Sequence, residues 1–267
     1  MKLHRIVVSF VALALLAIAH PAGAAVHGKL VEYKQGDTVL EGYLAVDDAI
    51  KGKRPGILVV HAWMGLDDNA KHRADMLAQL GYVAFAADIY GKGVRPKTKD
   101  EAGPLAGKYK NDRALLRARV NAGLATLLAQ PNVDTGKTAA IGYCFGGTTA
   151  LELARSGAQL SGVVSFHGGL DSPTPADAKN IKAKLLVLHG AADPFEKPAD
   201  FTAFQKELVD AKVDWQLVQY GGAVHCFTDK TAGSDATTGC AYDPNADARS
   251  WTAMRAFFDE LFAAKKS

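Results

Sequence analysis

The sequence has little cysteine, no strong excess of either charge, and only one long hydrophobic run. Its 267 residues include three cysteines, and 31 lysines and arginines stand against 28 aspartates and glutamates. Three cysteines cannot all pair within one chain. The spacing of the histidines matches no zinc pattern, and we expect no metal and no cofactor. The near balance of charge gives no reason to expect binding to nucleic acid or to an anionic membrane surface. The length allows one large α/β domain or two small ones.

The one long hydrophobic run spans residues 6–19, close to the start of the chain. A short positively charged stretch precedes it, and the small residues Ala22-Gly23-Ala24 follow it. This order is typical of a cleavable secretory signal peptide. A retained membrane anchor is the alternative, but the run is shorter than the roughly 20 residues that a spanning helix needs. We therefore expect a signal peptide over 1–24 and a secreted or periplasmic mature protein, 25–267, without a membrane span.

After this leader, short apolar segments alternate with segments of helical spacing, and no repeat or long linker interrupts them. Such alternation predicts an α/β fold, in which a mostly parallel central sheet carries helices on both faces. Two segments around the Gly36-Asp37 turn predict an antiparallel hairpin at the N-terminal edge of the sheet. We expect a single domain with strands at 29–34, 38–46, 56–61, 82–87, 138–143, 162–167, 184–189 and 213–220, and helices at 69–80, 112–130, 146–155, 200–211 and 246–264.

A strand, a cysteine flanked by glycines and a helix follow one another around Gly142-Tyr143-Cys144-Phe145-Gly146. This is the pattern of the nucleophile elbow of α/β-hydrolases, with cysteine where serine is usual. A residue at so sharp a turn is strained, and a side chain two positions before or after it would collide with backbone, which explains both glycines. The start of the following helix favours a thiolate over a thiol. The alternative is that Cys144 is simply a small residue of the core.

Two further polar residues, Asp193 and His225, lie just beyond the ends of later predicted strands, where open α/β sheets bind ligands. Taken singly, they would be explained as a turn aspartate and a surface histidine. Together with Cys144 they follow the order nucleophile, acid, histidine of an α/β-hydrolase triad. We predict that Cys144 attacks a carbonyl to form a thioester. His225 then handles the thiol proton and later activates water, while Asp193 orients the imidazole.

The loop after the strand at 56–61 occupies the place in this fold that supplies an oxyanion donor. We expect the backbone N–H groups of Trp63 and Phe145 to be the two donors. Trp63, Tyr90 and Phe145 are the expected walls of the pocket, which indicates an apolar or aromatic acyl group in the substrate.

The other two cysteines depend on the role of the first. If Cys144 is the nucleophile, Cys226 and Cys240 remain either as a disulfide that closes a short loop or as free thiols. Because disulfide geometry is specific and the sequence says nothing of distance, both alternatives stay open.

The triad residues and the oxyanion loop lie in segments that are together specific. They are Val60-His61-Ala62-Trp63-Met64-Gly65-Leu66, Ala87-Asp88-Ile89-Tyr90-Gly91, Gly142-Tyr143-Cys144-Phe145-Gly146-Gly147, His189-Gly190-Ala191-Ala192-Asp193 and Gly222-Ala223-Val224-His225-Cys226-Phe227. These segments resemble the dienelactone hydrolase family, the carboxymethylenebutenolidase-like proteins of the α/β-hydrolase fold, and the resemblance runs from about residue 32 to residue 262. It implies hydrolysis of a small ester or lactone, with Cys144, Asp193 and His225 as the triad.

Two features depart from the pattern of that family. Ala62 stands where its members usually have a glutamate that interacts with the resting thiol, so activation of the thiol falls to the histidine and the helix dipole. Lys92 and Asp229 match positions where family arginines bind the carboxylate of dienelactone. Because an aspartate would repel an anionic lactone, we expect a different ester or lactone as substrate, with Tyr90 and Lys92 as pocket residues.

A second hypothesis is a catalytically silent protein that keeps the fold and binds a small ester-like ligand. Ala62 and the risk of oxidising an exported thiol favour it, whereas the presence of all three triad residues favours an enzyme. We expect the enzyme, as a monomer whose partners are a small ester or lactone and water.

Overall fold

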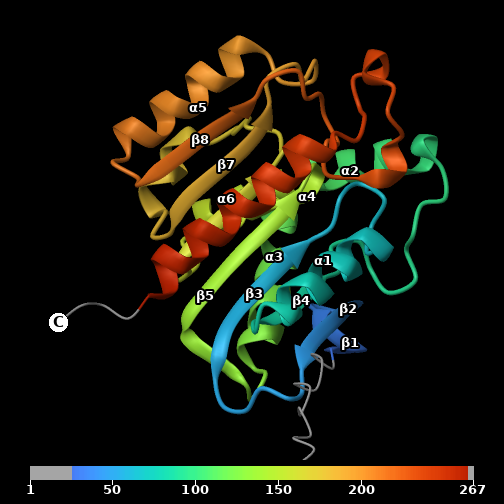
Figure 1. Cartoon of the computed structure of the whole chain (residues 1–267), viewed down its shortest axis with the longest axis vertical. Coiled ribbons are helices and arrows are strands. Elements are labelled where there is room, and N and C mark those ends of the chain that lie inside the picture. Colours follow the sequence, from blue (N-terminus) through green and yellow to red (C-terminus); the bar gives the residue numbers. More distant parts are fainter. Residues whose placement is uncertain (1–25, 264–267) are drawn as a thin grey trace, which may run out of the picture.

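Figure 1 shows the computed structural model, which describes residues 26–263. The predicted signal peptide lies outside the described residues. The described chain forms one eight-stranded sheet in the order β1-β2-β4-β3-β5-β6-β7-β8, antiparallel between β1, β2 and β4 and parallel elsewhere. The prediction of a mostly parallel sheet with an antiparallel N-terminal edge is therefore confirmed. The strands are β1 Val26–Gln35, β2 Thr38–Asp47, β3 Arg54–Val60, β4 Val83–Ala87, β5 Val133–Tyr143, β6 Gly162–Phe166, β7 Lys184–Gly190 and β8 Trp215–Tyr220.

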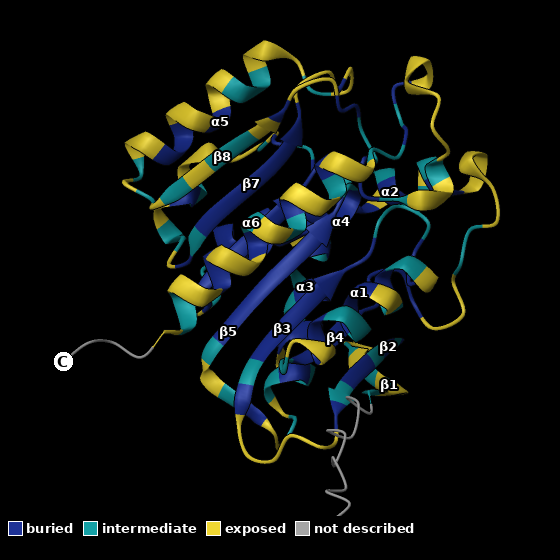
Figure 2. Cartoon of the chain, viewed as in Figure 1, coloured by how far each residue is buried: buried dark blue, intermediate teal, exposed yellow. Residues whose placement is uncertain are grey.

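The inner strands are continuous apolar runs because helices cover both faces of the sheet. Every residue of β4 and β6 is buried, and in Figure 2 the exposed residues lie mainly on the outer faces of the helices, in the loops and on the edge strands β1 and β8. Side chains of α1 and α6 form the core on one face, and those of α3, α4 and α5 form the core on the other. None of the described helices is long and apolar enough to cross a membrane. The helices are α1 Asp68–Gln79, α2 Lys99–Asn111, α3 Arg113–Leu128, α4 Phe145–Arg155, α5 Pro198–Asp210 and α6 Pro244–Phe262.

Helix α2 is an element that the sequence analysis did not predict. Gly103, Pro104 and Gly107 lie inside it, and these residue types disfavour a helix interior. Tertiary packing overrides them, because the buried residues Ala102, Ala106 and Tyr109 lie on one helical face. A signal was present in the sequence: Thr98 caps the helix by accepting the N–H of Glu101, in a Thr-x-x-Glu pattern that marks helix starts.

Helix α4 begins at the predicted nucleophile, and buried ion pairs hold its other end. The Arg155 guanidinium contacts both carboxylate oxygens of Glu207 in α5, at 2.7 and 3.0 Å, and Glu152 at 3.0 Å. Arg117 of α3 contacts the other oxygen of Glu152 at 2.8 Å. Arg155 and Glu152 are almost fully buried, so each charge depends on its partners. The network fixes α4 against α3 and α5.

We expect Arg155→Met to lower the free energy of unfolding by about 3–5 kcal/mol, because it leaves the buried Glu207 carboxylate without its partner and removes one of the partners of Glu152. Urea unfolding followed by circular dichroism measures this difference. Lys206→Met is the matched control, since Lys206 pairs with Asp210 on the exposed surface of α5 and its loss should change stability little. Equal losses in the two variants would contradict a structural role for the buried network.

Candidate active site

A sharp turn between β5 and α4 places Cys144 at the carboxyl edge of the sheet. Its φ of 53° and ψ of −117° are strained for a residue with a side chain. The two glycines around it have no room for a Cβ atom. A Cβ on Gly142 would lie 1.9 Å from the carbonyl oxygen of Gly146, and a Cβ on Gly146 would lie 2.2 Å from that of Val60. The helix can therefore start directly after the strand, with the nucleophile at the apex of the turn.

The surroundings of the Cys144 thiol favour its ionised form. Burial acts to raise its pKa, but the charge of His225 and the hydrogen bond between the two side chains outweigh burial. The N–H of Phe145 and the more distant ammonium of Lys110 act in the same direction, so the pKa of the thiol lies below its usual value. Because the thiolate is the reactive form of cysteine, this environment suits a nucleophile.

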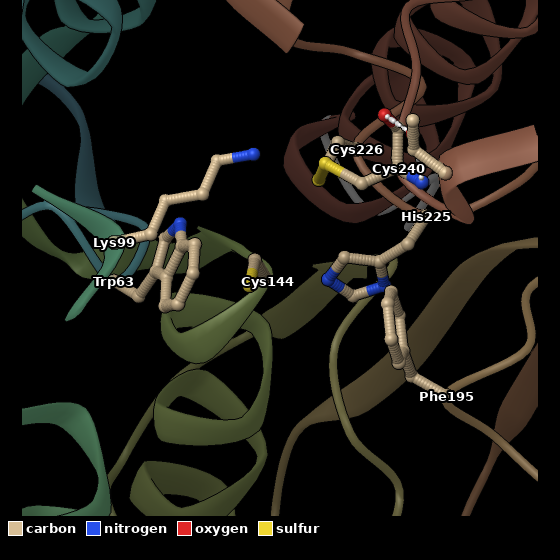
Figure 3. Close-up of a pocket in the computed structure, with 8 residues that line it drawn as sticks. Trp63, Lys99, Cys144, Phe195, His225, Cys226 and Cys240 are labelled. Carbon is tan, nitrogen blue, oxygen red and sulfur yellow. Dashed lines mark hydrogen bonds between the residues drawn. A yellow bond between two sulfur atoms is a disulfide. The ribbon is translucent and has the colours of Figure 1, made fainter. Parts of the chain in front are cut away.

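His225 lies in the loop after β8, and its ring points toward Cys144 (Figure 3). Its Nδ1 lies 2.7 Å from Oδ2 of Asp193. Burial acts to lower the pKa of His225, but the Cys144 thiolate and the Asp193 carboxylate raise it to about 10. The imidazole is therefore positioned to stay protonated between two anions.

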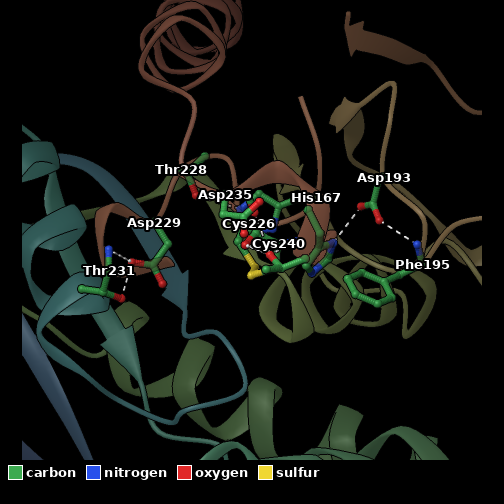
Figure 4. The surroundings of a disulfide bond; sticks show 11 residues. His167, Asp193, Phe195, Cys226, Thr228, Asp229, Thr231, Asp235 and Cys240 are labelled. Atoms are coloured by element: carbon green, nitrogen blue, oxygen red, sulfur yellow. Dashed lines mark hydrogen bonds and ion pairs between the residues drawn. A yellow bond between two sulfur atoms is a disulfide. The ribbon is translucent and has the colours of Figure 1, made fainter. Parts of the chain in front are cut away.

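Asp193 follows β7 and is held by other groups besides His225. One oxygen accepts the N–H of Phe195 at 2.9 Å, as Figure 4 shows, and Nε2 of His189 lies 3.1 Å from the other. Burial acts to raise the pKa of this carboxyl group, but the hydrogen bonds from His189 and His225 hold it well below its usual range. The structure thus brings Cys144, Asp193 and His225 together from the ends of three parallel strands.

Two other histidines at strand ends, His167 and His61, lie within hydrogen-bond distance of groups outside the triad. Nε2 of His167 lies 2.7 Å from Oγ1 of Thr228, and the ring lies 5.0 Å from that of His225. Nδ1 of His61 lies 2.6 Å from the carbonyl oxygen of the next residue, while its Nε2 accepts the N–H of Ile89 at 3.1 Å. Burial lowers the pKa of His61 to about 4 and puts that of His167 well below its usual value. Within residues 26–263, no cluster of histidine, cysteine and carboxylate side chains could hold a metal ion.

Two hollows open onto the same four residues, which are Trp63, Cys144, Phe195 and His225. The larger, of about 370 Å³, is called here the disulfide-side hollow, because its other walls are Lys99, Cys226, Thr238 and Cys240 (Figure 3). The smaller, of about 210 Å³, is called the α2-side hollow, and its other walls are Ala106, Lys110, Phe145, Thr148, Gly169 and Glu196. A substrate with two unequal parts could thus lie across the thiol.

Trp63 and Phe145, the predicted oxyanion donors, both lie beside the thiol. Trp63 is a wall of both hollows, and Phe145 is the first residue of α4. Tyr90, predicted as a pocket residue, is instead buried behind Trp63 and lines neither hollow. Its hydroxyl donates to the carbonyl oxygen of Trp63 at 2.9 Å, so Tyr90 supports the loop that forms the wall.

Lys92, also predicted as a pocket residue, lies elsewhere. Its backbone N–H donates to Val39 of β2, which turns the side chain toward the antiparallel edge, where the ammonium pairs with Glu32. The cations near the thiol are Lys99 and Lys110, which the sequence analysis passed over because it did not predict α2.

Two of the departures from the family pattern, Ala62 and Asp229, lie close to Cys144. Ala62 and Asp229 border a small hollow of about 20 Å³ beside Cys144. The Asp229 carboxylate accepts hydrogen bonds from the backbone N–H and the hydroxyl of Thr231, at 2.8 and 2.7 Å (Figure 4). Position 62 itself carries no carboxylate, and the groups that lower the pKa of the thiol are His225, the N–H of Phe145 at the helix start and Lys110.

Cys226 and Cys240 form a disulfide, with their Cα atoms 5.0 Å apart, and Cys144 is the free cysteine. The first of the two alternatives left open by the sequence is therefore the one that the structure contains. Both cysteines of the disulfide line the disulfide-side hollow.

Comparisons with known proteins identify the family and agree with the fold. The model of the dienelactone hydrolase family matches residues 40–262. Protein usf of Aquifex pyrophilus is 29% identical over 238 residues, which cover 87% of this chain and 98% of that protein. Two solved structures, m3DLH and a dienelactone hydrolase-like promiscuous phosphotriesterase from metagenomic libraries, are 46% and 45% identical, with TM-scores of 0.86 and 0.85. Each covers 90% of this chain over its own full length. The chain belongs to the dienelactone hydrolase family and is a hydrolase of the carboxylic-ester class.

Proposed function

We propose that this hydrolase cleaves small esters or lactones with Cys144 as a covalent nucleophile. The observation that carries the proposal is the thiol at the strained apex of the turn, facing an imidazole that is itself held by a buried carboxylate at 2.7 Å. Nucleophile, base and orienting group in this arrangement are typical of acyl transfer.

In the acylation step the Cys144 thiolate attacks the carbonyl carbon, a C–S bond forms, and the carbonyl electrons move onto oxygen. The N–H groups of Trp63 and Phe145 are the proposed donors to this oxyanion. As the C–O bond breaks, protonated His225 gives its proton to the leaving alkoxide. Neutral His225 then takes a proton from water, the resulting hydroxide attacks the thioester, and the thiolate leaves. Asp193 stabilises His225 at each step in which the imidazole is protonated.

The walls of the disulfide-side hollow, apart from Lys99, support a substrate with an uncharged or weakly polar part. Trp63, Phe195 and the disulfide give the disulfide-side hollow an apolar character. Lys92 pairs with Glu32 away from both hollows, so the two positions matched to the family arginines supply no cation to the thiol. An ester with an apolar or aromatic acyl group fits this hollow.

The 45% identity to a promiscuous phosphotriesterase supports neutral phosphotriesters as a second substrate class. We propose that the same thiolate attacks phosphorus and displaces an aryloxide. Release of an aryl alcohol from a diethyl aryl phosphate by the wild type, but not by Cys144→Ala, would support this activity. Equal release by the two proteins would contradict it.

We also propose that the mature protein is exported. The signal-peptide pattern at 1–24 supports export, and so does the disulfide, because disulfides persist mainly in oxidising compartments. Detection of the mature protein in the periplasmic or culture fraction, with a new N-terminus after residue 24 or 25, is the expected result.

Cys144→Ala should lower the rate of hydrolysis of a small activated aryl ester by about 1,000-fold or more, because triad members act as a unit. The measurement is the release of para-nitrophenol from para-nitrophenyl acetate, with and without a reductant that restores oxidised Cys144. Lys92→Ala is the control, since its ammonium lies away from both hollows, and it should keep the wild-type rate. No turnover by wild-type protein in which Cys144 is reduced and the Cys226–Cys240 disulfide is intact would favour the catalytically silent binding protein.

The pH dependence should report the Cys144–His225 pair. Because the pKa of the thiol is lowered, alkylation of Cys144 by iodoacetamide should become fast at a pH below the usual thiol range. Ester hydrolysis should then fall as the pH rises through about 10, where His225 loses its proton. In His225→Ala the alkylation step should move to higher pH, because burial then acts without the opposing charge. Identical alkylation profiles in the two proteins would exclude the ion pair.

A further inference from the structure

The disulfide lies directly beside the catalytic candidate in the chain. Cys226 is the residue after His225, and its bond to Cys240 closes a loop with a sequence separation of 14. Residues 230–238 of this loop are nearly all exposed, and none of them is buried, so this stretch has little apolar packing of its own, whereas Phe227 at the start of the loop is buried in the core.

Both backbone polar groups of His225 are held by the segment that contains Cys240. The N–H of His225 donates to the carbonyl oxygen of Gly239, and its own carbonyl accepts the N–H of Ala241, each at 3.0 Å. The same segment packs against the loop of the triad acid, because a Cβ on Gly239 would lie 2.6 Å from Cγ of Pro194. The backbone of His225 is therefore held by the segment around Cys240, and the disulfide joins that segment covalently to the residue after His225.

The backbone at Cys226 is strained. Its φ of 61° is in the left-handed region, which residues with a side chain adopt only when the surroundings impose it. The covalent bond to Cys240 and the hydrogen bond from the N–H of Asp229 to the carbonyl oxygen of Cys226, at 2.8 Å, both oppose relaxation. If Cys226 relaxed, the direction of the preceding residue would change, and with it the contact of His225 to Asp193.

From these contacts we infer that the Cys226–Cys240 disulfide is a positioning device for His225, which holds the imidazole between Asp193 and Cys144. The inference rests on the proposed function of that triad. Cys226, Cys240 and Cys144 line one hollow, so the active protein needs two of its sulfurs oxidised and the third reduced in the same cavity. Cys226 and Cys240 are thus positioning residues, since they act through His225.

The test is the double variant Cys226→Ser/Cys240→Ser, compared with the wild type and with Phe258→Leu. Phe258 is a buried core residue of α6 that packs against Tyr82, so its substitution lowers stability without changing the His225 loop. We expect the double variant to lose at least tenfold in kcat on para-nitrophenyl acetate with a smaller change in KM. Its Cys144 alkylation step should move to higher pH, because a displaced imidazolium lowers the thiol pKa less. Phe258→Leu should keep both the kcat and the alkylation step.

A double variant that is folded, keeps kcat within twofold and keeps the wild-type alkylation step would overturn the inference. A wild type whose Cys144 alkylates only in the usual thiol range would overturn the Cys144–His225 pair itself, which separates the two failures. If the double variant does not fold, the same measurements apply to wild-type protein treated with a water-soluble phosphine. The phosphine gains an oxygen atom from water and becomes a phosphine oxide, while the disulfide becomes two thiols. The expected result is the same loss of kcat with Cys144 still free.

Discussion

The close approach of α4 to the ends of β3 and β5 is the constraint on which the rest of the site depends. Gly146 lies so near Val60 that a single added Cβ would reach its carbonyl oxygen at 2.2 Å. This contact lets the first turn of α4 start at Cys144, and it also sets the distance from α4 to the loop that carries Trp63. One packing contact therefore positions both Cys144 and the loop of Trp63, the proposed second oxyanion donor, while the ion pairs of Arg155 hold the far end of the same helix.

The electrostatics of the site centre on His225, which lies between Cys144 and Asp193 and packs against the neutral ring of His167. Cys144 and Asp193 are the anions on either side of His225, and their effect on its pKa exceeds that of burial. His167 lies 5.0 Å from the same ring, and a second imidazolium there would oppose the charge of His225. Burial keeps the pKa of His167 well below its usual value, so it packs against the charged ring without competing with it.

Family membership leaves the substrate open, because recognition depends on side chains that differ from the family pattern. Ala62 removes a carboxylate from beside the thiol, Lys92 binds Glu32, and Asp229 is held by Thr231. The cations of the two hollows, Lys99 and Lys110, come instead from the two ends of α2. The catalytic parts are thus set by the sheet, whereas the parts that would select a substrate come from loops and from a helix outside the central layers.

The sequence by itself determined the sheet, the elbow and the order of the triad, because each is a local pattern. Strands buried on both faces must be apolar throughout, and a nucleophile at a sharp turn needs glycines two residues away. Only the tertiary structure decided that Cys226 pairs with Cys240, that Tyr90 lies behind Trp63, and that Lys92 turns away from the site. Helix α2 was also not predicted from the sequence, because its glycines and its proline disfavour a helix that tertiary packing nevertheless stabilises. Contacts between segments far apart in the chain set all of these features, and residue spacing carries no record of such distances.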